Sequence, residues 1–225
     1  MYVPAHFAAN DLAKIAAFVD GAGAADLVTF DGTRLVSTLL PVIWDRDGGA
    51  NGRLLGHIAL NNPQWKTAAA GVPALAIIRG PQAYISPSWY QSTREHGRTV
   101  PTWNYTAVHF TGPVTFRRDD DWLRAVVTRL TERHEAGRNG RWWVSDAPEK
   151  FIAGQLRAIV GVEMRVELIE AKEKLSQNRT PQDRAGVIAA LRAEPGGGAP
   201  GGGADGGGAH AIAELMAARE AAAEG

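Results

Sequence analysis

The chain contains no cysteine, and it carries no excess charge of either sign. The missing thiols exclude disulfides, zinc–thiolate centres, iron–sulfur clusters and thiol catalysis, so a bound cofactor would have to supply any redox chemistry. The absence of cysteine also agrees with a cytoplasmic location. With 24 basic and 24 acidic side chains the formal net charge is zero, which argues against a strongly basic nucleic-acid binder but leaves room for a local basic patch.

Long hydrophobic runs are lacking as well. The longest apolar stretches, such as residues 74–78, have the length of a strand and end in charge or proline, so we expect no membrane span. Residues 1–7 show no basic region followed by an apolar stretch, and we therefore expect no signal peptide. The hydrophobic content of 45% is nevertheless sufficient for one substantial core.

Glycine is concentrated near the end of the chain. Nine of the 26 glycines lie at residues 195–208, a segment with almost no side chain to bury. We therefore predict a folded domain over residues 1–193, a flexible linker over 194–208 and an Ala/Glu-rich tail over 209–225. The tail has helical propensity, but its thin apolar stripe favours a frayed, peripheral helix over one that docks on a partner.

Apolar periodicity and turn signals predict about six strands with helices inserted between them. The strands are expected at residues 26–30, 33–44, 53–60, 74–85, 103–117 and 159–169. The helices are expected at residues 11–19, 119–136 and 181–192, with shorter ones beginning near residues 62 and 148. This order is typical of an α+β fold, here an antiparallel β-barrel with peripheral helices.

Polar side chains interrupt two of the predicted strands. Ser37 and Thr38 must point to opposite faces of an apolar strand, so one hydroxyl faces the interior and needs a partner, either a backbone carbonyl or a ligand. His57 lies in the next strand, and Asn61 follows where that strand leads into a short helix. Free N–H groups at a helix N-terminus suit an anion such as phosphate, although a lone histidine in a strand is more often structural.

Two stretches, at residues 80–90 and 100–105, are rich in aromatic side chains, and the second contains Trp103. They fit either stacking on a planar ligand or packing in a core or interface. The loop at residues 172–179 crowds donors together after the last strand: Lys174, Ser176, Gln177 and Arg179. A lysine point charge beside an arginine fork suits a phosphate group, and the alternative is a solvated charged loop.

Other chemistries have no recognisable motif. The sequence contains no GxSxG elbow, no HExxH pair and no GxGxxG turn after a strand. The six histidines show no metal-ligand spacing, and no helix-turn-helix can be recognised. We therefore expect no metal site, and no catalytic residue is assigned from the sequence.

Taken in order, these stretches resemble a known family, the PaiB-like proteins, often labelled FMN-binding negative transcriptional regulators. The resemblance covers about residues 1–192 and rests on several short motifs. These are MYVPxHF at 1–7, STLLP at 37–41, GHIA at 56–59, NPQW at 62–65, GPQAYISPSWY at 80–90, VPTWNY at 100–105 and KLSQNR at 174–179.

The resemblance implies a split β-barrel of the flavin-reductase and pyridoxamine-phosphate-oxidase type, usually a homodimer with FMN in the groove between subunits. By that analogy Lys174 and Arg179 bind the phosphate, in a loop that also contains Ser176 and Gln177. Trp103 stacks on the flavin or lies in the dimer seam. Contacts to the ring and the ribityl chain are assigned to Ser37, Thr38, His57 and Asn61.

Three functions remain open at this point. The family label favours an FMN-binding regulator, for which DNA is a partner by resemblance only, because the net charge of zero does not support it. The same fold serves flavin-dependent oxidoreductases, and its groove holds FMN, a deazaflavin or haem. The third hypothesis is a cofactor-free, dimeric interaction protein.

Overall fold

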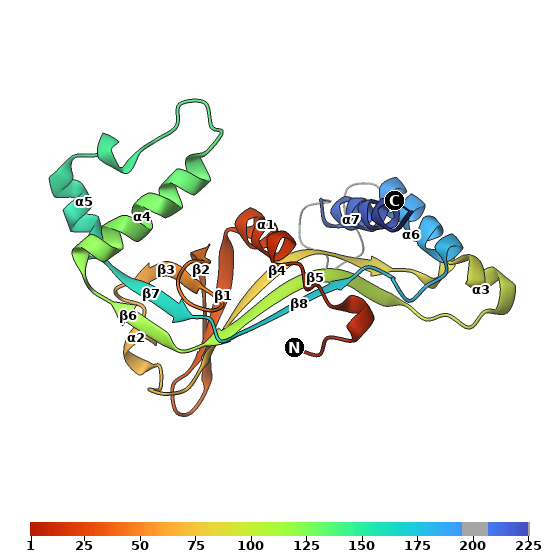
Figure 1. Ribbon diagram of the computed structural model, residues 1–225, viewed down its shortest axis with the longest axis horizontal. Coiled ribbons are helices and arrows are strands. Elements are labelled where there is room, and N and C mark those ends of the chain that lie inside the picture. The colour runs from red at the N-terminus through yellow and green to blue at the C-terminus, as the bar shows by residue number, and fades with distance from the viewer. Residues whose placement is uncertain (195–206, 225) are drawn as a thin grey trace. The chain divides into compact units, whose positions relative to one another are not determined.

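The computed structural model describes residues 1–194 and 207–224 (Figure 1). The predicted linker therefore lies outside the described residues, apart from its ends. No helix among the described residues combines the length and the apolar character needed to cross a membrane.

Eight strands form one sheet in the order β6-β7-β3-β2-β1-β4-β5-β8. Their bounds are β1 Ala24–Phe30, β2 Leu35–Asp45, β3 Arg53–Ala59, β4 Ala74–Ile85, β5 Thr102–Gly112, β6 Val114–Arg117, β7 Ile159–Arg165 and β8 Leu168–Lys174. The pairings of β1 with β2 and β4, and of β7 with β3 and β6, are all antiparallel. The predicted α+β, mainly antiparallel split-barrel fold is confirmed.

Two of the predicted strands are each divided in the structure. The strand expected over 103–117 breaks between β5 and β6, where Pro113 offers no N–H to a neighbouring strand. Gly112 stands at this break because a Cβ there would collide with the backbone carbonyl of Arg165. The strand expected over 159–169 is also divided, into β7 and β8, and Arg165 at the end of β7 lies beside Gly112.

Three of the helices begin directly after a residue whose side chain caps them. The helix bounds are α1 Leu12–Ala22, α2 Gln64–Thr67, α3 Gln91–His96, α4 Asp120–Glu135, α5 Glu149–Leu156, α6 Pro181–Ala193 and α7 Gly207–Glu224. The Asp11 carboxylate accepts hydrogen bonds from the first N–H groups of α1, Asp119 caps α4, and Thr180 caps α6. Single 3₁₀ turns lie at Ala5–Phe7, Pro87–Trp89 and Val144–Asp146.

The described residues form two compact units. Unit 1 comprises Met1–Asn10, Arg79–Ala107 and the described part of Ala171–Gly225, and unit 2 comprises Asp11–Ile78 and Val108–Glu170. The chain passes from one unit to the other inside β4 and β5, and at β8. Because these boundaries fall within strands, the sequence shows no Gly- or Pro-rich linker there.

In unit 2 part of the apolar stripe of α4 packs on the sheet. Val126 and Leu130 are buried against Ile43 of β2 and Leu55 of β3, whereas Leu123 packs with α5 in a second cluster. In Figure 1, α4 and α5 lie next to each other. Leu123, Val126 and Leu130 stand three and four positions apart, so they lie on one side of the helix.

In unit 1 the C-terminal helix belongs to the core. Ile212 and Ala213 of α7 are fully buried, and they share a hydrophobic cluster with Ile85, Tyr90 and Val187. Helices α6 and α7 run side by side (Figure 1). The expectation of a frayed, peripheral tail was therefore wrong, because burial of a side chain as large as that of Ile212 stabilises a fold by about 1.5–3 kcal/mol.

Candidate functional site

The predicted site residues fall into both units. Unit 1 contains Trp103 and the loop with Lys174, Ser176, Gln177 and Arg179, whereas unit 2 contains Ser37, Thr38, His57 and Asn61. The two groups differ in what their side chains already contact.

Two of the four loop residues have partners inside the protein. Ser176 is buried, and its hydroxyl accepts a hydrogen bond from Nδ2 of Asn104 at 3.0 Å. The Gln177 side chain accepts from the N–H of Leu175 at 2.7 Å and donates to the carbonyl of Glu173. Both side chains therefore fix the shape of the loop.

Lys174 is half-buried, and its ammonium has only neutral partners. Its Nζ donates to the hydroxyl of Thr102 at 2.6 Å and to the carbonyl of Trp103. Lys172 stands two residues earlier on the same face of β8, where its buried side chain donates to the carbonyl of Tyr2 at 3.1 Å. Both Nζ atoms lie within 6 Å of the Phe7 ring centroid, at 5.9 and 5.8 Å.

This lysine pair is electrostatically uncompensated. Among residues 1–194 and 207–224, no carboxylate forms an ion pair with either lysine. Burial lowers the pKa of Lys174, and the positive charges of Lys172 and Arg179 lower it further. A bound anion would relieve both penalties at once.

Arg179 completes the cationic cluster. Its guanidinium lies 4.6 Å from the centroid of the Tyr90 ring, a cation–π contact. Tyr90 is fully buried, and its hydroxyl has no hydrogen-bond partner among the described residues. Burial raises the pKa of this hydroxyl despite the nearby Arg179 charge, so Tyr90 is neutral and serves as a platform for the guanidinium.

Trp103 keeps part of its surface accessible. It is 38% exposed and contacts the Tyr84 ring edge-on at 6.1 Å between ring centroids. Sequence reasoning missed Lys172, Tyr90 and Asn104, although two signals were present. The first was the alternation that puts Lys172 beside Lys174, and the second was the position of Tyr90 and Asn104 within the recognised motifs.

In unit 2 the strand alternation separates Ser37 from Thr38. Ser37 is exposed and lies between Leu35 and Leu39, which are 71% and 68% exposed. Thr38 shares the opposite face with the buried Leu40, and its hydroxyl accepts a hydrogen bond from Nδ2 of Asn62 at 2.8 Å. The inward-facing hydroxyl is thus that of Thr38, and its partner is an amide side chain.

His57 lies on the face of β3 that also carries Leu55. It pairs with Gly161 of β7, which in turn pairs with Arg117 of β6. The ring of Trp122 occupies the space where a Cβ on Gly161 would lie. Burial lowers the pKa of His57, and its Nδ1 has no hydrogen-bond partner among the described residues, so a neutral imidazole with one unused nitrogen stands here.

The junction after β3 differs from the predicted anion site. Helix α2 is a single turn, and the N–H of Gln64 is already bonded to Oδ1 of Asn62 at 3.0 Å. Asn61 is exposed. The fully buried Gln64 donates to the carbonyls of Leu27 and Val36 and to the Thr29 hydroxyl. The Gln64 side chain of the NPQW motif thus connects β1 with β2, a structural role that the sequence analysis did not predict.

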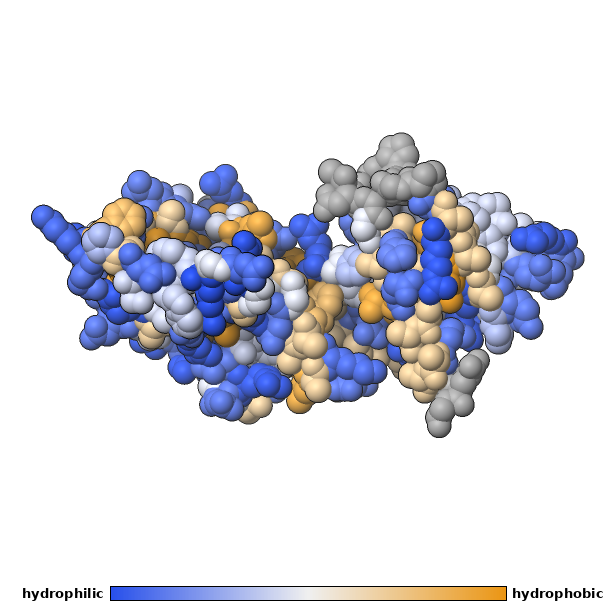
Figure 2. Space-filling view, turned by 90° about the horizontal axis from the view of Figure 1, so that it is seen from above, coloured by the Kyte–Doolittle hydropathy of each residue, from blue (hydrophilic) through white to orange (hydrophobic). Residues whose placement is uncertain are grey.

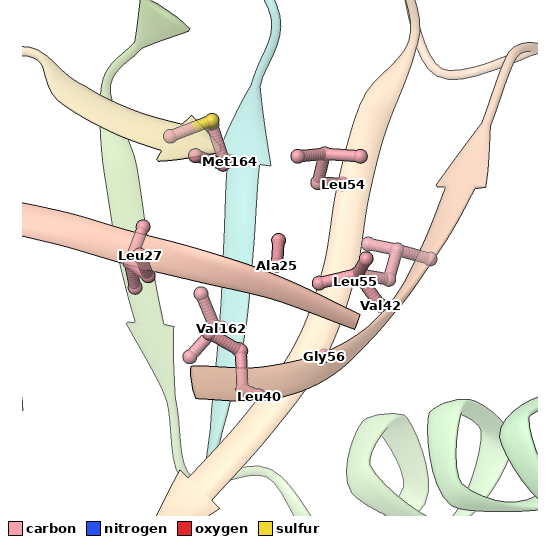
Figure 3. A pocket seen from close by; sticks show the side chains of 10 residues that line it. Ala25, Leu27, Leu40, Val42, Leu54, Leu55, Gly56, Val162 and Met164 are labelled. Atoms are coloured by element: carbon pink, nitrogen blue, oxygen red, sulfur yellow. The ribbon is translucent and has the colours of Figure 1, made fainter. Parts of the chain in front are cut away.

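A small cavity lies inside unit 2, between its strands (Figure 3). It offers about 10 Å³ to the centre of a water-sized sphere, which is the space for about one water molecule. Its lining is apolar: Ala25, Leu27, Leu40, Val42, Leu54, Leu55, Gly56, Ala76, Val162 and Met164. The cavity is therefore a gap in the core and cannot hold a flavin. The described residues also contain no cluster of three or more acidic or histidine side chains that could hold a metal ion.

Known proteins match this chain in sequence and in fold. The model of a family described as "Putative FMN-binding domain" matches residues 1–168. The "Protease synthase and sporulation protein PAI 2" of Bacillus subtilis is 37% identical over 195 residues, 86% of this chain and 90% of the relative. An uncharacterized protein of Aspergillus fumigatus is 33% identical over 61% of this chain and 65% of the relative.

Two solved structures share the fold. The FAD- and haem-binding protein of Mycobacterium smegmatis has a TM-score of 0.54 and 15% identity, covering 79% of this chain and 78% of that chain. The flavocytochrome Anf3 of Azotobacter vinelandii has a TM-score of 0.55 and 13% identity, covering 82% and 78%. The sheet, the helices and these likenesses define a protein of the split-barrel fold class.

Within that class, the chain belongs to the PaiB-like family of FMN-binding proteins. The residues present fit FMN. The uncompensated lysine pair suits a phosphate, and the unused nitrogen of His57 suits a polar atom of a flavin. The match to the family model ends at residue 168, so the role of residues 174–179 depends on the structure of unit 1.

Proposed function

We propose that this FMN-binding protein holds the cofactor's phosphate with Lys174 and Arg179, in residues 174–179, which we name the phosphate loop. The observation that carries the proposal is the cluster of Lys172, Lys174 and Arg179, in which neither lysine has an acidic partner among the described residues. A phosphate with two negative charges would offset two of these three positive charges and accept charge-assisted hydrogen bonds. Ser176 and Gln177 support the loop from within.

For unit 2, taken by itself, we propose polar contacts to a flavin ring or ribityl chain. Ser37 and His57 lie on one face of the sheet and offer a hydroxyl and a neutral imidazole to the ring or the ribityl chain. Thr38 and Asn61 are weaker candidates, because the Thr38 hydroxyl already has a partner and Asn61 lies in an exposed turn. Trp103 offers an aromatic surface to a planar ring or to a second subunit.

The exposed strip of Leu35 and Leu39 supports a homodimer. Two leucines that are each about 70% exposed on one strand face are costly to leave in water. Figure 2 shows one face of the molecule, on which hydrophobic and hydrophilic residues are interspersed. A second copy of the chain would cover the strip with the same strip, as a two-fold axis requires.

The function that the family membership supports best is that of a cytoplasmic regulator whose FMN reports on redox state. A flavin-dependent oxidoreductase is the second candidate, and His57 favours it, because a neutral, partly buried imidazole can donate or accept a proton beside a flavin. A deazaflavin or haem in place of FMN, and a cofactor-free interaction protein, are the remaining alternatives.

A visible spectrum of the purified protein separates these functions first. Flavin absorbance that stays with the protein on gel filtration, as purified or after addition of FMN, supports the proposal, whereas a colourless protein that does not bind FMN contradicts it. Anaerobic mixing with NADH or NADPH is the second step. Rapid bleaching indicates an oxidoreductase, whereas no bleaching together with salt-sensitive DNA binding indicates a regulator.

A further inference from the structure

The C-terminal helix α7 contacts the surroundings of the phosphate loop within unit 1. This helix lies well beyond residue 168, where the match to the family model ends. It packs beside α6, and its buried face consists of Ala209, Ile212, Ala213 and Met216. Three polar contacts lead from this helix towards residues 173–179.

The first contact passes through a single arginine. The Glu220 carboxylate of α7 accepts hydrogen bonds from Nε and Nη2 of Arg184 on α6, at 2.6 and 2.9 Å. The Nη1 atom of the same guanidinium donates to the backbone carbonyl of Arg179 at 2.6 Å. Because the guanidinium is planar and rigid, Glu220 sets the orientation in which Arg184 holds the end of the phosphate loop.

The second contact reaches the middle of the loop. Met216 of α7 lies with its sulfur 3.4 Å from Nδ2 of Asn104, the same nitrogen that donates to Ser176. Ser176 has a φ of 63° and is the only non-glycine residue with a positive φ in the described part of the chain. A left-handed serine persists only where its surroundings hold it, and here Asn104 and Met216 provide that support.

The third contact lies at the start of the loop. Arg219 of α7 donates to the Glu173 carboxylate at 3.3 Å, one residue before Lys174. The helix therefore contacts the loop region at its beginning, through Asn104 at its middle and through Arg184 at its end.

A second ion pair between α6 and α7 serves as a comparison for the Arg184–Glu220 pair. Glu214 of α7 accepts a hydrogen bond from Arg192 of α6 at 2.9 Å, and both side chains are about half exposed. No hydrogen bond connects Arg192 to residues 173–179 among the described residues. Glu214 and Glu220 thus differ in whether their arginine also contacts the loop, and the Glu214 pair is the more exposed of the two.

We infer that α7 is a positioning element for the phosphate site, and that Glu220, acting through Arg184, sets the affinity of the protein for the phosphate group of FMN. This inference rests on the proposed function, because it needs Lys174 and Arg179 to bind that phosphate. Glu220 itself does not touch the cofactor. Through Arg184, it determines where the backbone of Arg179 lies, and hence the position from which the Arg179 side chain extends.

The test compares FMN with riboflavin, which has the same ring and ribityl chain but no phosphate. Dissociation constants are measured by quenching of flavin fluorescence for the full-length chain and for Glu220→Gln. The variant should bind FMN about threefold to tenfold more weakly and riboflavin as the wild type does. The matched control, Glu214→Gln, should leave both constants unchanged.

A double-mutant cycle then checks the route through the arginine. If Glu220 acts through Arg184, Glu220→Gln adds no further loss of FMN affinity to an Arg184→Gln chain. Equal FMN affinity of the two glutamate variants would overturn the inference, and so would an equal loss of FMN and riboflavin binding in Glu220→Gln.

Arg179→Ala separates this inference from the proposed function. If Arg179→Ala binds FMN like the wild type, the phosphate site lies elsewhere, and both proposals are wrong. If Arg179→Ala weakens FMN binding and Glu220→Gln does not, only the role of α7 is wrong.

Discussion

The two lysines of β8 in unit 1 and the charged side chains between the strands of unit 2 differ in whether they have counter-ions. In unit 2, Asp45 accepts a hydrogen bond from Arg53 at 2.9 Å and pairs with Arg129 at 3.5 Å, while Glu163 pairs with Arg53 and Arg117. Burial raises the pKa of Asp45, but these two arginines more than offset it, so the pKa is lowered and the carboxylate stays ionised. In unit 1, Lys172 and Lys174 have no such partners among the described residues.

The difference shows which charges belong to the structure and which are left for a ligand. Paired charges in unit 2 satisfy each other, so they connect strands and offer little to an outside anion. Half-buried cations without a partner are unfavourable in the free protein, and a fold retains them where a ligand supplies the missing charge. The predictions below test this contrast between the lysine pair of unit 1 and the paired charges of unit 2.

The largest effect is expected from removing both cations of the phosphate loop. Lys174→Ala combined with Arg179→Ala should weaken FMN binding by up to about 3–6 kcal/mol, since each charge-assisted hydrogen bond contributes about 1.5–3 kcal/mol. Fluorescence titration with FMN and riboflavin measures the loss, which should be confined to FMN. Lys150→Ala, at an exposed lysine of unit 2, is the control. An unchanged FMN affinity of the double variant would refute the phosphate site.

Removing the buried amide of unit 2 should affect stability instead of affinity. Gln64→Leu leaves the carbonyls of Leu27 and Val36 and the Thr29 hydroxyl without their donor, and an unsatisfied buried polar group costs about 1–3 kcal/mol. Urea unfolding should show a loss of at least that size, with an unchanged ratio of FMN to riboflavin affinity. The exposed Gln91→Leu is the matched control. A changed ratio would contradict the contrast between the units.

A charge on the exposed strip should separate the proposed homodimer. Leu39→Lys removes an apolar contact and places two like charges near the two-fold axis, so dimerisation should weaken at least about tenfold, given roughly 1.5–3 kcal/mol for a buried leucine. Analytical ultracentrifugation over a concentration series measures the change. Leu12→Lys, at a leucine that is 59% exposed on α1, should leave the dimer intact. An unaffected Leu39→Lys dimer would place the interface elsewhere.

The smallest effect concerns the pH dependence of stability. Burial lowers the pKa of His57 in the folded chain below the ordinary value of 6.5. Below that value the unfolded chain therefore binds more protons, and stability falls as the pH falls from about 7 through 6.5. His57→Gln should reduce this acid-induced loss in thermal unfolding between pH 7.5 and about 5.

The reduction should be partial, because burial also lowers the pKa of His109. His96→Gln, at an exposed histidine, is the matched control. A His57→Gln slope identical to that of the wild type would mean that the imidazole is solvated in the folded protein.

Local signals in the sequence predicted much of the fold. The caps at Asp11, Asp119 and Thr180 mark helix starts because their side chains satisfy N–H groups only a few residues away. The alternation of β2 required Ser37 and Thr38 to face opposite sides. It could not predict which one faces inward, because that depends on Asn62, more than twenty residues later.

The error about α7 has a physical reason too. The apolar stripe in the sequence consisted of Ile212, Leu215 and Met216, yet Leu215 is 36% exposed. The buried face uses Ala209 and Ala213 in place of Leu215. Alanine adds little to an apolar stripe, but its small side chain lets two helices approach closely.

The sequence by itself determined the family, the cofactor class and most of the strands and helices, because these depend on local motifs and periodicity, and it predicted the residue types of a phosphate site. Only the tertiary structure decided which loop donors are already used and which cations lack a counter-ion. It also decided that α7 supports the loop. Hydrogen-bond partners such as Asn104 with Ser176, or Glu220 with Arg184, are brought together by packing across 72 and 36 positions of the chain, a distance over which no sequence pattern specifies a contact.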